Sequence, residues 1–197
     1  MATFLAKAMD RDRKQILTEY LVLQAQDGNE RGICELYSLW HHDLLRYARS
    51  RVQGETAAEE VAQEAWLHIA KGLSRLNDPA CFPRWAYQIV FRRSADWVRR
   101  ESRRRHRQNV LEREAEQVLP QQDASAFSPV TEQWDQVQIA LSRMQQSERD
   151  VLELFYLSGL DIAAIADVLG IPCGTVKSRL FYAREHLRDA MLSGDLE

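Results

Sequence analysis

Basic, hydroxyl and aromatic side chains occur together in residues 177–184, at positions that one helix would turn outward. Lysine and arginine bind phosphate oxygens, and hydroxyl groups and aromatic rings can meet base edges in the major groove of DNA. The side chains of this kind are Lys177, Ser178, Arg179, Phe181, Tyr182 and Arg184. The apolar residues between them, Val176, Leu180 and Ala183, share another face and are expected in the core. The pattern predicts DNA contact, with a solvated basic face as the simpler alternative.

The elements around this segment have the order of a helix-turn-helix. A short apolar helix comes first, and its apolar positions are Ile162, Ile165, Ala166 and Leu169. Gly170 then provides the sharp turn, and the second helix opens at Gly174-Thr175. In this motif the first helix packs, and the second carries its polar side chains toward the major groove.

A second candidate DNA-binding element is the strongly basic helix expected over 82–107. Between residues 92 and 107 it has eight arginines against Asp96 and Glu101, a net charge of +6 over sixteen residues. Like charges repel along a helix, so this cluster favours a polyanionic partner over a plain solvated end. Rings interleaved with the arginines could stack on unpaired bases. These rings belong to Trp85, Tyr87, Phe91 and Trp97, although Trp85 and Ile89 are equally well explained as core residues.

The composition is that of an ordinary globular chain. The 197 residues are 45% hydrophobic and 28% charged, with a net charge of −3, so any attraction to nucleic acid must come from local clusters. Cys34, Cys81 and Cys173 are far apart and odd in number, which favours a reducing compartment over a disulfide framework. His41 and His42 lie near Cys34, but further ligands are lacking, so we predict no metal and no cofactor. Without a transmembrane run or a signal peptide, we expect a cytoplasmic protein.

Helical periodicity runs through nearly the whole sequence, and no segment alternates convincingly. We therefore predict an all-α fold of two small helical domains, 13–107 and 131–191. The first domain would hold helices at about 13–25, 30–52, 55–73 and 82–107; the second would open with a helix over 131–144. A flexible acidic linker, 108–130, would join them, because prolines and glutamines replace large apolar residues there. In the first helix we place Leu17, Leu21 and Tyr20 inward, and in the second Tyr37 among other apolar residues.

The third expected helix, for which Thr56 is a candidate cap, has two distinct faces. Its apolar face holds Val61, Ala62, Ala65, Trp66, Ile69 and Leu73. Its opposite face holds Glu59, Glu60, Gln63, Glu64, His68 and Lys71. Such a polar stripe suits a partner-binding helix, and it equally suits a solvated surface.

Three segments in this order resemble the extracytoplasmic-function (ECF) sigma factors, the small two-domain class of the bacterial sigma-70 superfamily. AEEVAQEAWLHIA (58–70) resembles the polymerase-binding helix of that family, and FPRWAYQIVFRRSADWVRR (82–100) its promoter-melting and −10-reading helix. Residues 148–187, and GTVKSRL above all, resemble its −35-reading domain. The match covers about residues 20–190.

The resemblance implies a non-enzymatic subunit that binds core RNA polymerase and promoter DNA. The residues that would dock on the clamp coiled coil of the largest polymerase subunit are Glu60, Gln63 and Glu64. A base flipped from the −10 element would be received by loop 77–83 with Trp85, Tyr87, Gln88 and Arg92. The backbone of the melted strand would be held by Arg93, Arg99 and Arg100. The −35 element would meet Lys177, Ser178, Phe181 and Tyr182, and its phosphates Arg179 and Arg184.

A cognate anti-sigma factor is also implied, because members of this family are usually held inactive by one. Two positions depart from the family pattern: Arg92 replaces a small polar residue that is common there, and Tyr182 replaces a basic one.

Two other classes of protein remain as alternatives. A stand-alone helix-turn-helix regulator of the response-regulator type would carry alternating strands and helices at its N-terminus, and residues 13–107 show no strand pattern. A helical enzyme using His41, His42 or Glu64 would need a second catalytic group at a fixed spacing, which the sequence does not offer.

Overall fold

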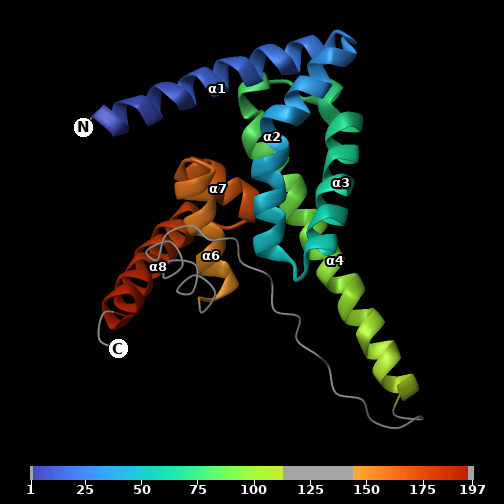
Figure 1. Cartoon of the computed structure of the whole chain (residues 1–197), viewed down its shortest axis with the longest axis vertical. Coiled ribbons are helices and arrows are strands. Elements are labelled where there is room, and N and C mark those ends of the chain that lie inside the picture. Colours follow the sequence, from blue (N-terminus) through green and yellow to red (C-terminus); the bar gives the residue numbers. More distant parts are fainter. Residues whose placement is uncertain (1, 113–143, 195–197) are drawn as a thin grey trace.

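The computed structural model describes residues 2–112 and 144–194, and every regular element in these two ranges is helical (Figure 1). The predicted all-α fold of two helical regions is therefore confirmed. Within the described ranges, no helix combines the length and apolar character needed to cross a membrane.

The N-terminal region consists of four helices and two 3-10 turns. The helices are α1 (Ala2–Gln26), α2 (Glu30–Arg51), α3 (Glu55–Gly72) and α4 (Phe82–Glu112), and the turns are η1 (Leu73–Arg75) and η2 (Pro79–Cys81). Asn29 caps α2 by accepting a hydrogen bond from the Arg31 amide at 3.1 Å. Gly54, at φ 90°, precedes α3 without a side-chain cap, so the prediction that Thr56 caps this helix is wrong: Thr56 already lies in its first turn.

Apolar side chains from all four helices meet in the core of this region. Leu36, Leu44, Val61, Ile69, Phe82 and Val90 are fully buried there. Trp40 is also buried, and its indole donates to Thr18 on α1 at 2.9 Å. The apolar face predicted for α3 is buried throughout.

Some predicted core positions of α1 and α2 are wrong. Leu21 is buried as predicted, but Leu17 and Tyr20 are 43% and 57% exposed. The helix turns Thr18 and Val22 toward α2 in their place, and both are fully buried. Tyr37 is likewise exposed, and its ring stacks on His41 with centroids 4.5 Å apart.

The C-terminal region contains α6 (Gln146–Leu152), a π-helical turn (Glu153–Leu157), α7 (Ile162–Leu169) and α8 (Cys173–Gly194). Val151, Leu154 and Ile165 are fully buried, and the predicted core face of α8, Val176, Leu180 and Ala183, is buried against them. The first residues of the predicted linker, 108–112, belong to α4. The rest of the linker and the predicted helix 131–144, apart from Met144, lie outside the described residues.

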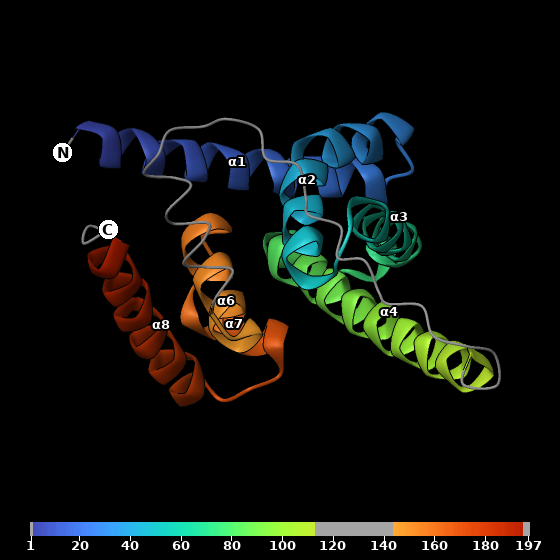
Figure 2. The ribbon, with the colours of Figure 1, turned by 60° about the horizontal axis from the view of Figure 1, so that its bottom comes forward.

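The two regions pack against each other. Figures 1 and 2 show the C-terminal helices beside α2 and the first half of α4, with α8 on the outer side. The second half of α4 projects away from the rest of the structure as a rod. One DNA-binding candidate is therefore at the edge of the molecule, and part of the other lies between the two regions.

Candidate nucleic-acid interface

The turn between α7 and α8 is fixed by hydrogen bonds at every step. Asp161 caps α7 by accepting from the Ala164 amide at 2.7 Å. Gly170 ends α7 in the left-handed conformation, at φ 66°, where a residue with a Cβ would be strained. The carbonyl of Pro172 then accepts from the amides of Thr175 and Val176 at 2.9 and 3.1 Å and starts α8. The predicted helix-turn-helix is present, and its second helix begins at Cys173, one residue before the predicted start.

The outer face of α8 displays the side chains that the sequence predicted for it. Lys177 and Ser178 are exposed, and Phe181 and Tyr182 are 60% and 58% exposed. The Ser178 hydroxyl lies 3.1 Å from the Thr175 carbonyl within the same helix, which fixes its orientation. The rings of Phe181 and Tyr182 lie edge to face with their centroids 5.5 Å apart, so together they form an exposed aromatic patch that is suited to binding.

Two arginines of the predicted −35 set are less accessible to DNA than the residues above. Arg179 is half-buried. Arg184 is exposed, but its guanidinium lies over the rings of Phe155 and Tyr156 at 5.4 and 5.5 Å from their centroids. This cation–π contact holds Arg184 at the edge of α8, near the π-helical turn.

The basic helix α4 partly neutralises its own charge. Asp96 pairs with Arg93 at 3.1 Å and with Arg99 at 2.5 Å, and the hydrogen bond from Arg99 lowers the pKa of Asp96. Glu101 pairs in the same way with Arg104 and Arg105, each at 2.9 Å. The exposed arginines Arg92, Arg103 and Arg107 have no acidic partner among the described residues, so the rod retains a positive surface.

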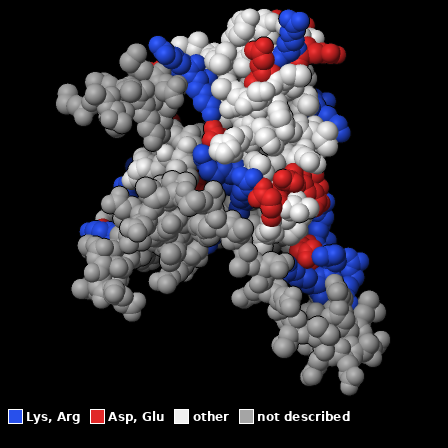
Figure 3. Space-filling view, in the orientation of Figure 1, with Lys and Arg blue, Asp and Glu red and all other residues white. Residues whose placement is uncertain are grey.

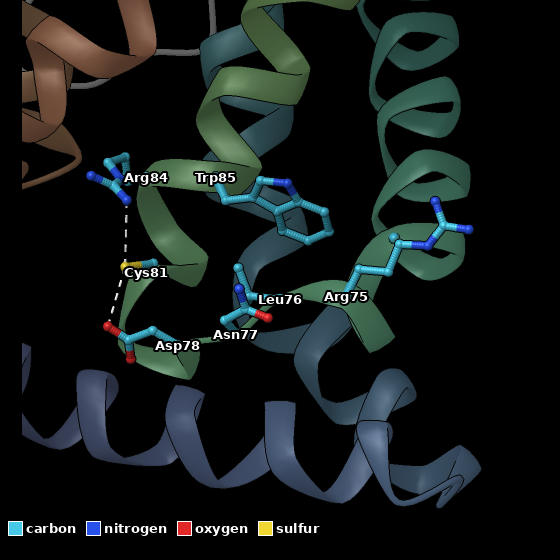
Figure 4. Close-up of a pocket in the computed structure, with 8 residues that line it drawn as sticks. Arg75, Leu76, Asn77, Asp78, Cys81, Arg84 and Trp85 are labelled. Carbon is cyan, nitrogen blue, oxygen red and sulfur yellow. Dashed lines mark hydrogen bonds between the residues drawn. The ribbon is translucent and has the colours of Figure 1, made fainter.

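A pocket of about 430 Å³ opens where the loop before α4 meets α3 (Figure 4). Its lining residues are Gly72, Arg75, Leu76, Asn77, Asp78, Cys81, Arg84 and Trp85. The Trp85 indole forms one wall, and a Cβ on Gly72 would come within 2.9 Å of it, so Gly72 is needed for this packing. Arg84 extends to the opposite side of the loop from Trp85, and donates to Cys81 Sγ at 3.5 Å.

The pocket brings together Trp85 and the loop predicted to receive a base, and it adds two arginines that the sequence analysis missed. Arg75 and Arg84 flank the loop on its two sides, and basic residues on both sides of a turn are the signal that could have found them. The loop is fixed by Asp78, which caps η2 by accepting from the Ala80 amide at 3.0 Å. A pocket with an aromatic wall and arginines at its rim suits a nucleobase and its phosphates.

Two of the predicted −10 residues are not free to meet DNA in this conformation. Tyr87 is fully buried, with edge-on contacts to the rings of Tyr47 and Trp40, and burial raises the pKa of its phenol. The prediction that Tyr87 contacts a base is therefore wrong here, because its ring is part of the core. Gln88 faces α7 and donates to the main-chain carbonyl of Asp167 at 2.9 Å.

The polar face of α3 lies next to the basic helix. Glu60 and Gln63 are exposed and Glu64 is half-buried, as expected for a surface that can meet a partner. Arg100 reaches across from α4 to Glu64 at 2.9 Å and to Glu60 at 3.9 Å. The Trp97 indole donates to Glu60 at 3.1 Å. In Figure 3 a cluster of acidic side chains lies next to basic ones at the upper end of the projecting helix.

The structure therefore joins two predicted surfaces that the sequence treated as separate. Arg100 was assigned to DNA and Glu64 to a protein partner, and the two form an ion pair. Leu67, which the sequence analysis did not single out, lies on α3 and is 60% exposed.

Among the described residues, no group of three or more His, Cys, Asp or Glu side chains is arranged to hold a metal ion. His41 stacks on Tyr37, and burial lowers its pKa. Cys34 and Cys173 are exposed free thiols in different regions.

Comparison with known proteins identifies the family. Residues 36–104 match sigma-70 region 2, and residues 134–187 match sigma-70, region 4. The chain is 30% identical over 163 residues to the ECF RNA polymerase sigma factor SigM of Mycobacterium tuberculosis, covering 81% of this chain and 77% of that protein. The chain belongs to the ECF sigma factor family. It is therefore a transcription initiation factor that carries both promoter-reading regions of the family.

Other relatives and structures agree with this assignment. The chain is 26% identical over 179 residues to the RNA polymerase sigma-H factor of Pseudomonas aeruginosa, covering 88% of this sigma factor and 93% of that one. It is also 26% identical to the probable RNA polymerase sigma factor RfaY of Xanthomonas campestris pv. campestris, covering 93% of this chain but spanning only 46% of that protein's length.

Two solved structures share the fold. CnrH in complex with the cytosolic domain of CnrY aligns with a TM-score of 0.63 at 23% identity, covering 91% of this sigma factor and 99% of CnrH. The sigma factor RpoE in complex with the anti-sigma factor NepR, from Bartonella quintana, aligns with a TM-score of 0.59 at 18% identity, covering 80% and 94% of the two chains.

Proposed function

We propose that this sigma factor acts as an exchangeable specificity subunit without catalysis of its own, and that its surfaces divide the work of promoter recognition. The exposed face of α8 reads the −35 duplex with Lys177, Ser178, Phe181 and Tyr182, while Arg179 and Arg184 bind phosphates. The pocket beside Trp85 receives a flipped base of the −10 element. The polymerase, and with it this subunit, works in the cytoplasm.

The observation that carries the proposal is the position of the pocket. It opens at the start of α4, a helix whose exposed arginines include Arg92 in its first half and Arg103 and Arg107 in the rod. A strand whose base enters the pocket would run along this rod, and Arg93 and Arg99 would exchange Asp96 for its phosphates. Flipping a base out of a duplex needs both a receiving pocket and a cationic track for the backbone.

Docking on core polymerase is assigned to the outer face of α3. Glu60, Gln63 and Glu64 supply the polar contacts, and the exposed side chain of Leu67 adds an apolar one at the same face. Charged rims around a small apolar centre are common in protein interfaces. Arg100 would serve both partners, because it contacts Glu64 and belongs to the basic helix.

An anti-sigma factor is part of the proposal. The sigma factor RpoE from Bartonella quintana was solved in complex with one, and that sigma factor shares the fold of this chain. Binding of such a partner would withhold the sigma factor from polymerase until a signal releases it.

A run-off transcription assay tests the proposed function. Purified chain and core polymerase are incubated with a pool of bacterial genomic fragments, and core polymerase alone serves as the control. We expect discrete start sites that depend on the chain, with a shared −35 and −10 sequence upstream. Specific binding of duplex DNA by the chain alone, with no initiation, would instead favour the stand-alone regulator.

A further inference from the structure

The loop that leads into α4, residues 73–81, is held by side chains of α1, and we refer to it as the pocket loop. Gln26, the last residue of α1, donates from Nε2 to the main-chain carbonyls of Leu73 at 2.9 Å and Leu76 at 2.8 Å. Gln15, on the same helix, donates to the carbonyl of Ala80 at 3.2 Å. The helix α1 therefore contacts the pocket loop at its beginning and at its end.

The two glutamines lie on one face of α1, at a separation that the helix fixes. Gln15 and Gln26 are about three helical turns apart, roughly 16 Å along the axis. Thr18 and Val22 lie between them on the same face and are fully buried. The indole of Trp40 on α2 donates to Thr18 at 2.9 Å, so α1 is itself anchored in the domain. Because a packed helix changes little in length, it sets the distance between the two ends of the pocket loop.

The segment held between the two glutamines carries polar groups that can read a base. Only Asn77, Asp78 and Pro79 lie between the carbonyls to which Gln26 and Gln15 donate. Asn77 and Asp78 line the pocket, and Figure 4 shows Asn77 on the same side of the loop as Trp85. Asp78 is already engaged as the cap of η2. The Asn77 amide, which has both a donor and an acceptor, is therefore suited to meet the edge of a base beside the indole.

Reading a base with an amide requires that the loop be held in place. Hydrogen bonds weaken steeply when the distance or the angle departs from its optimum. A side chain on a loop therefore discriminates well only when the residues behind it fix its position. The helix α1 ends before residues 36–104, the segment that matches sigma-70 region 2. The position of Asn77 thus depends on a helix outside the matched segment.

We propose that α1 is a positioning element of the −10 pocket, and that Gln26 and Gln15 set how strictly Asn77 discriminates between bases. Both glutamines act through the main chain of the pocket loop and touch no base themselves. The proposal rests on the function assigned above to the pocket. Its test therefore includes a variant of the pocket, so that failure of the pocket can be told from failure of its support.

Base discrimination is measured on single strands, because no duplex then has to be melted. Fluorescein-labelled non-template oligonucleotides span the −10 element of a promoter from the run-off assay and carry each of the four bases at each position in turn. The chain assembled with core polymerase binds them, and anisotropy gives the ratio of Kd between the worst and the best base. Partial unfolding lowers the active fraction for all four bases alike and leaves this ratio unchanged.

Variants of the pocket and of its support are then compared. Asn77→Ala locates the position that the pocket reads, because the ratio should fall toward one there and nowhere else. At that position Gln26→Glu should lower the ratio roughly fivefold or more, since a carboxylate of the same shape has no donor and repels both carbonyls. Gln26→Met should lower it about threefold. Gln24→Glu is the matched control: it adds the same charge to the same helix, and it can still accept from Asn29, as Gln24 does at 2.8 Å.

The second glutamine and the contrary outcomes complete the test. Gln15→Met should lower the ratio about twofold, because its hydrogen bond to Ala80 is longer and exposed. Ratios in both Gln26 variants equal to that of Gln24→Glu, at the position located by Asn77→Ala, would overturn the positioning role and leave the pocket as the reader. If Asn77→Ala changes the ratio at no position, the pocket reads no base, and its proposed function fails together with this inference. Gln26→Met keeps the test valid if Gln26→Glu fails to fold.

Discussion

The two helices proposed to bind DNA, α8 and α4, differ in how accessible their polar side chains are. The polar residues of α8 already face outward, and Phe181 and Tyr182 are left in water. Along α4, by contrast, Arg93 and Arg99 are held by Asp96, and Arg100 by Glu64. A helix that reads intact duplex can be preformed, because its target is rigid and always present. A helix that holds a melted strand meets its target only after the duplex has opened. Until then, carboxylates of the protein pair with its arginines in place of the phosphates.

The largest expected effect is on polymerase binding, and it should come from a change at the contact between α3 and α4. Glu64→Arg places a positive charge against the polymerase surface and against Arg100, and like charges across an interface cost several kcal/mol. We expect affinity for core polymerase to fall roughly a hundredfold, measured by fluorescence anisotropy of labelled chain. Binding of −35 duplex should not change. Glu35→Arg, at an exposed position of α2, is the control, and an equal loss there would remove α3 from the polymerase interface.

A smaller effect should distinguish the role of Arg99 from that of Arg100 on α4. Arg99→Ala together with Arg100→Ala should lower open-complex formation about tenfold. The slope of its salt dependence should decrease by the amount expected for the loss of roughly one to two phosphate contacts. The double variant should lose less polymerase binding than open complex. Because Arg100 alone contacts Glu64, Arg100→Ala should weaken both steps and Arg99→Ala only opening. Permanganate footprinting and polymerase binding measure the two steps, and equal losses would contradict the assignment.

On α8 the expected effects are comparable per residue but independent of the contact between the two regions. Lys177→Ala should lower affinity for −35 duplex roughly tenfold, as expected for loss of one base or phosphate contact. Asp167→Asn, which removes the ion pair with Arg84 on α4, should leave that affinity unchanged. Mobility shift with a duplex found by the run-off assay measures both, and a gain for Asp167→Asn would show that packing between the two regions restricts α8.

The smallest effect concerns pH and the contact between the regions. Burial raises the pKa of Glu153 to about 7, and the nearby charge of Asp150 raises it further. The hydrogen bond from Ser50 and the charges of Arg149 and Arg46 lower this pKa but do not cancel the effect of burial. If the two regions separate, Glu153 is no longer buried and this pKa should return toward 4.5. The closed form then binds more protons, so closure is favoured at low pH and weakens as the pH rises from about 5 to above 7.

Single-molecule energy transfer between donor and acceptor dyes on the exposed thiols of Cys34 and Cys173, with Cys81→Ser as background, measures this change. Glu153→Gln should abolish the pH dependence and keep the chain closed at pH 8. A pH dependence that persists in this variant would assign it to another group.

The helices could be predicted from the sequence, because a repeating apolar pattern fixes where a helix runs. The range 30–52 agrees with α2, and the two faces of α3 are correct. Positions at the border of two patterns could not be assigned: Leu17 and Tyr20 form an apolar stripe on α1 as plausible as that of Leu21 and Val22. Tyr87 has the composition of a DNA-contacting aromatic residue, and only packing against Tyr47 shows that it is core.

The contacts between the regions left no local trace in the sequence. Arg51 and Asp150 are 99 residues apart, and each occurs in a segment that resembles ordinary solvated surface. The pairing of Arg100 with Glu64 is similar, since both helices have several charges that could have paired. A pattern within one helix cannot specify which charge on another helix it will meet.

The packing of Trp85 on Gly72 bears on how such a protein can diverge. Any side chain at residue 72 would displace the indole of Trp85. Selection should therefore remove substitutions of Gly72, whichever promoter the protein reads. Arg75 and Asn77, at the rim of the same pocket, are exposed and free of that constraint. With the function proposed for this pocket, new promoter preferences could arise by substitution at the rim while the wall stays intact, so related proteins could acquire separate sets of genes without a change of fold.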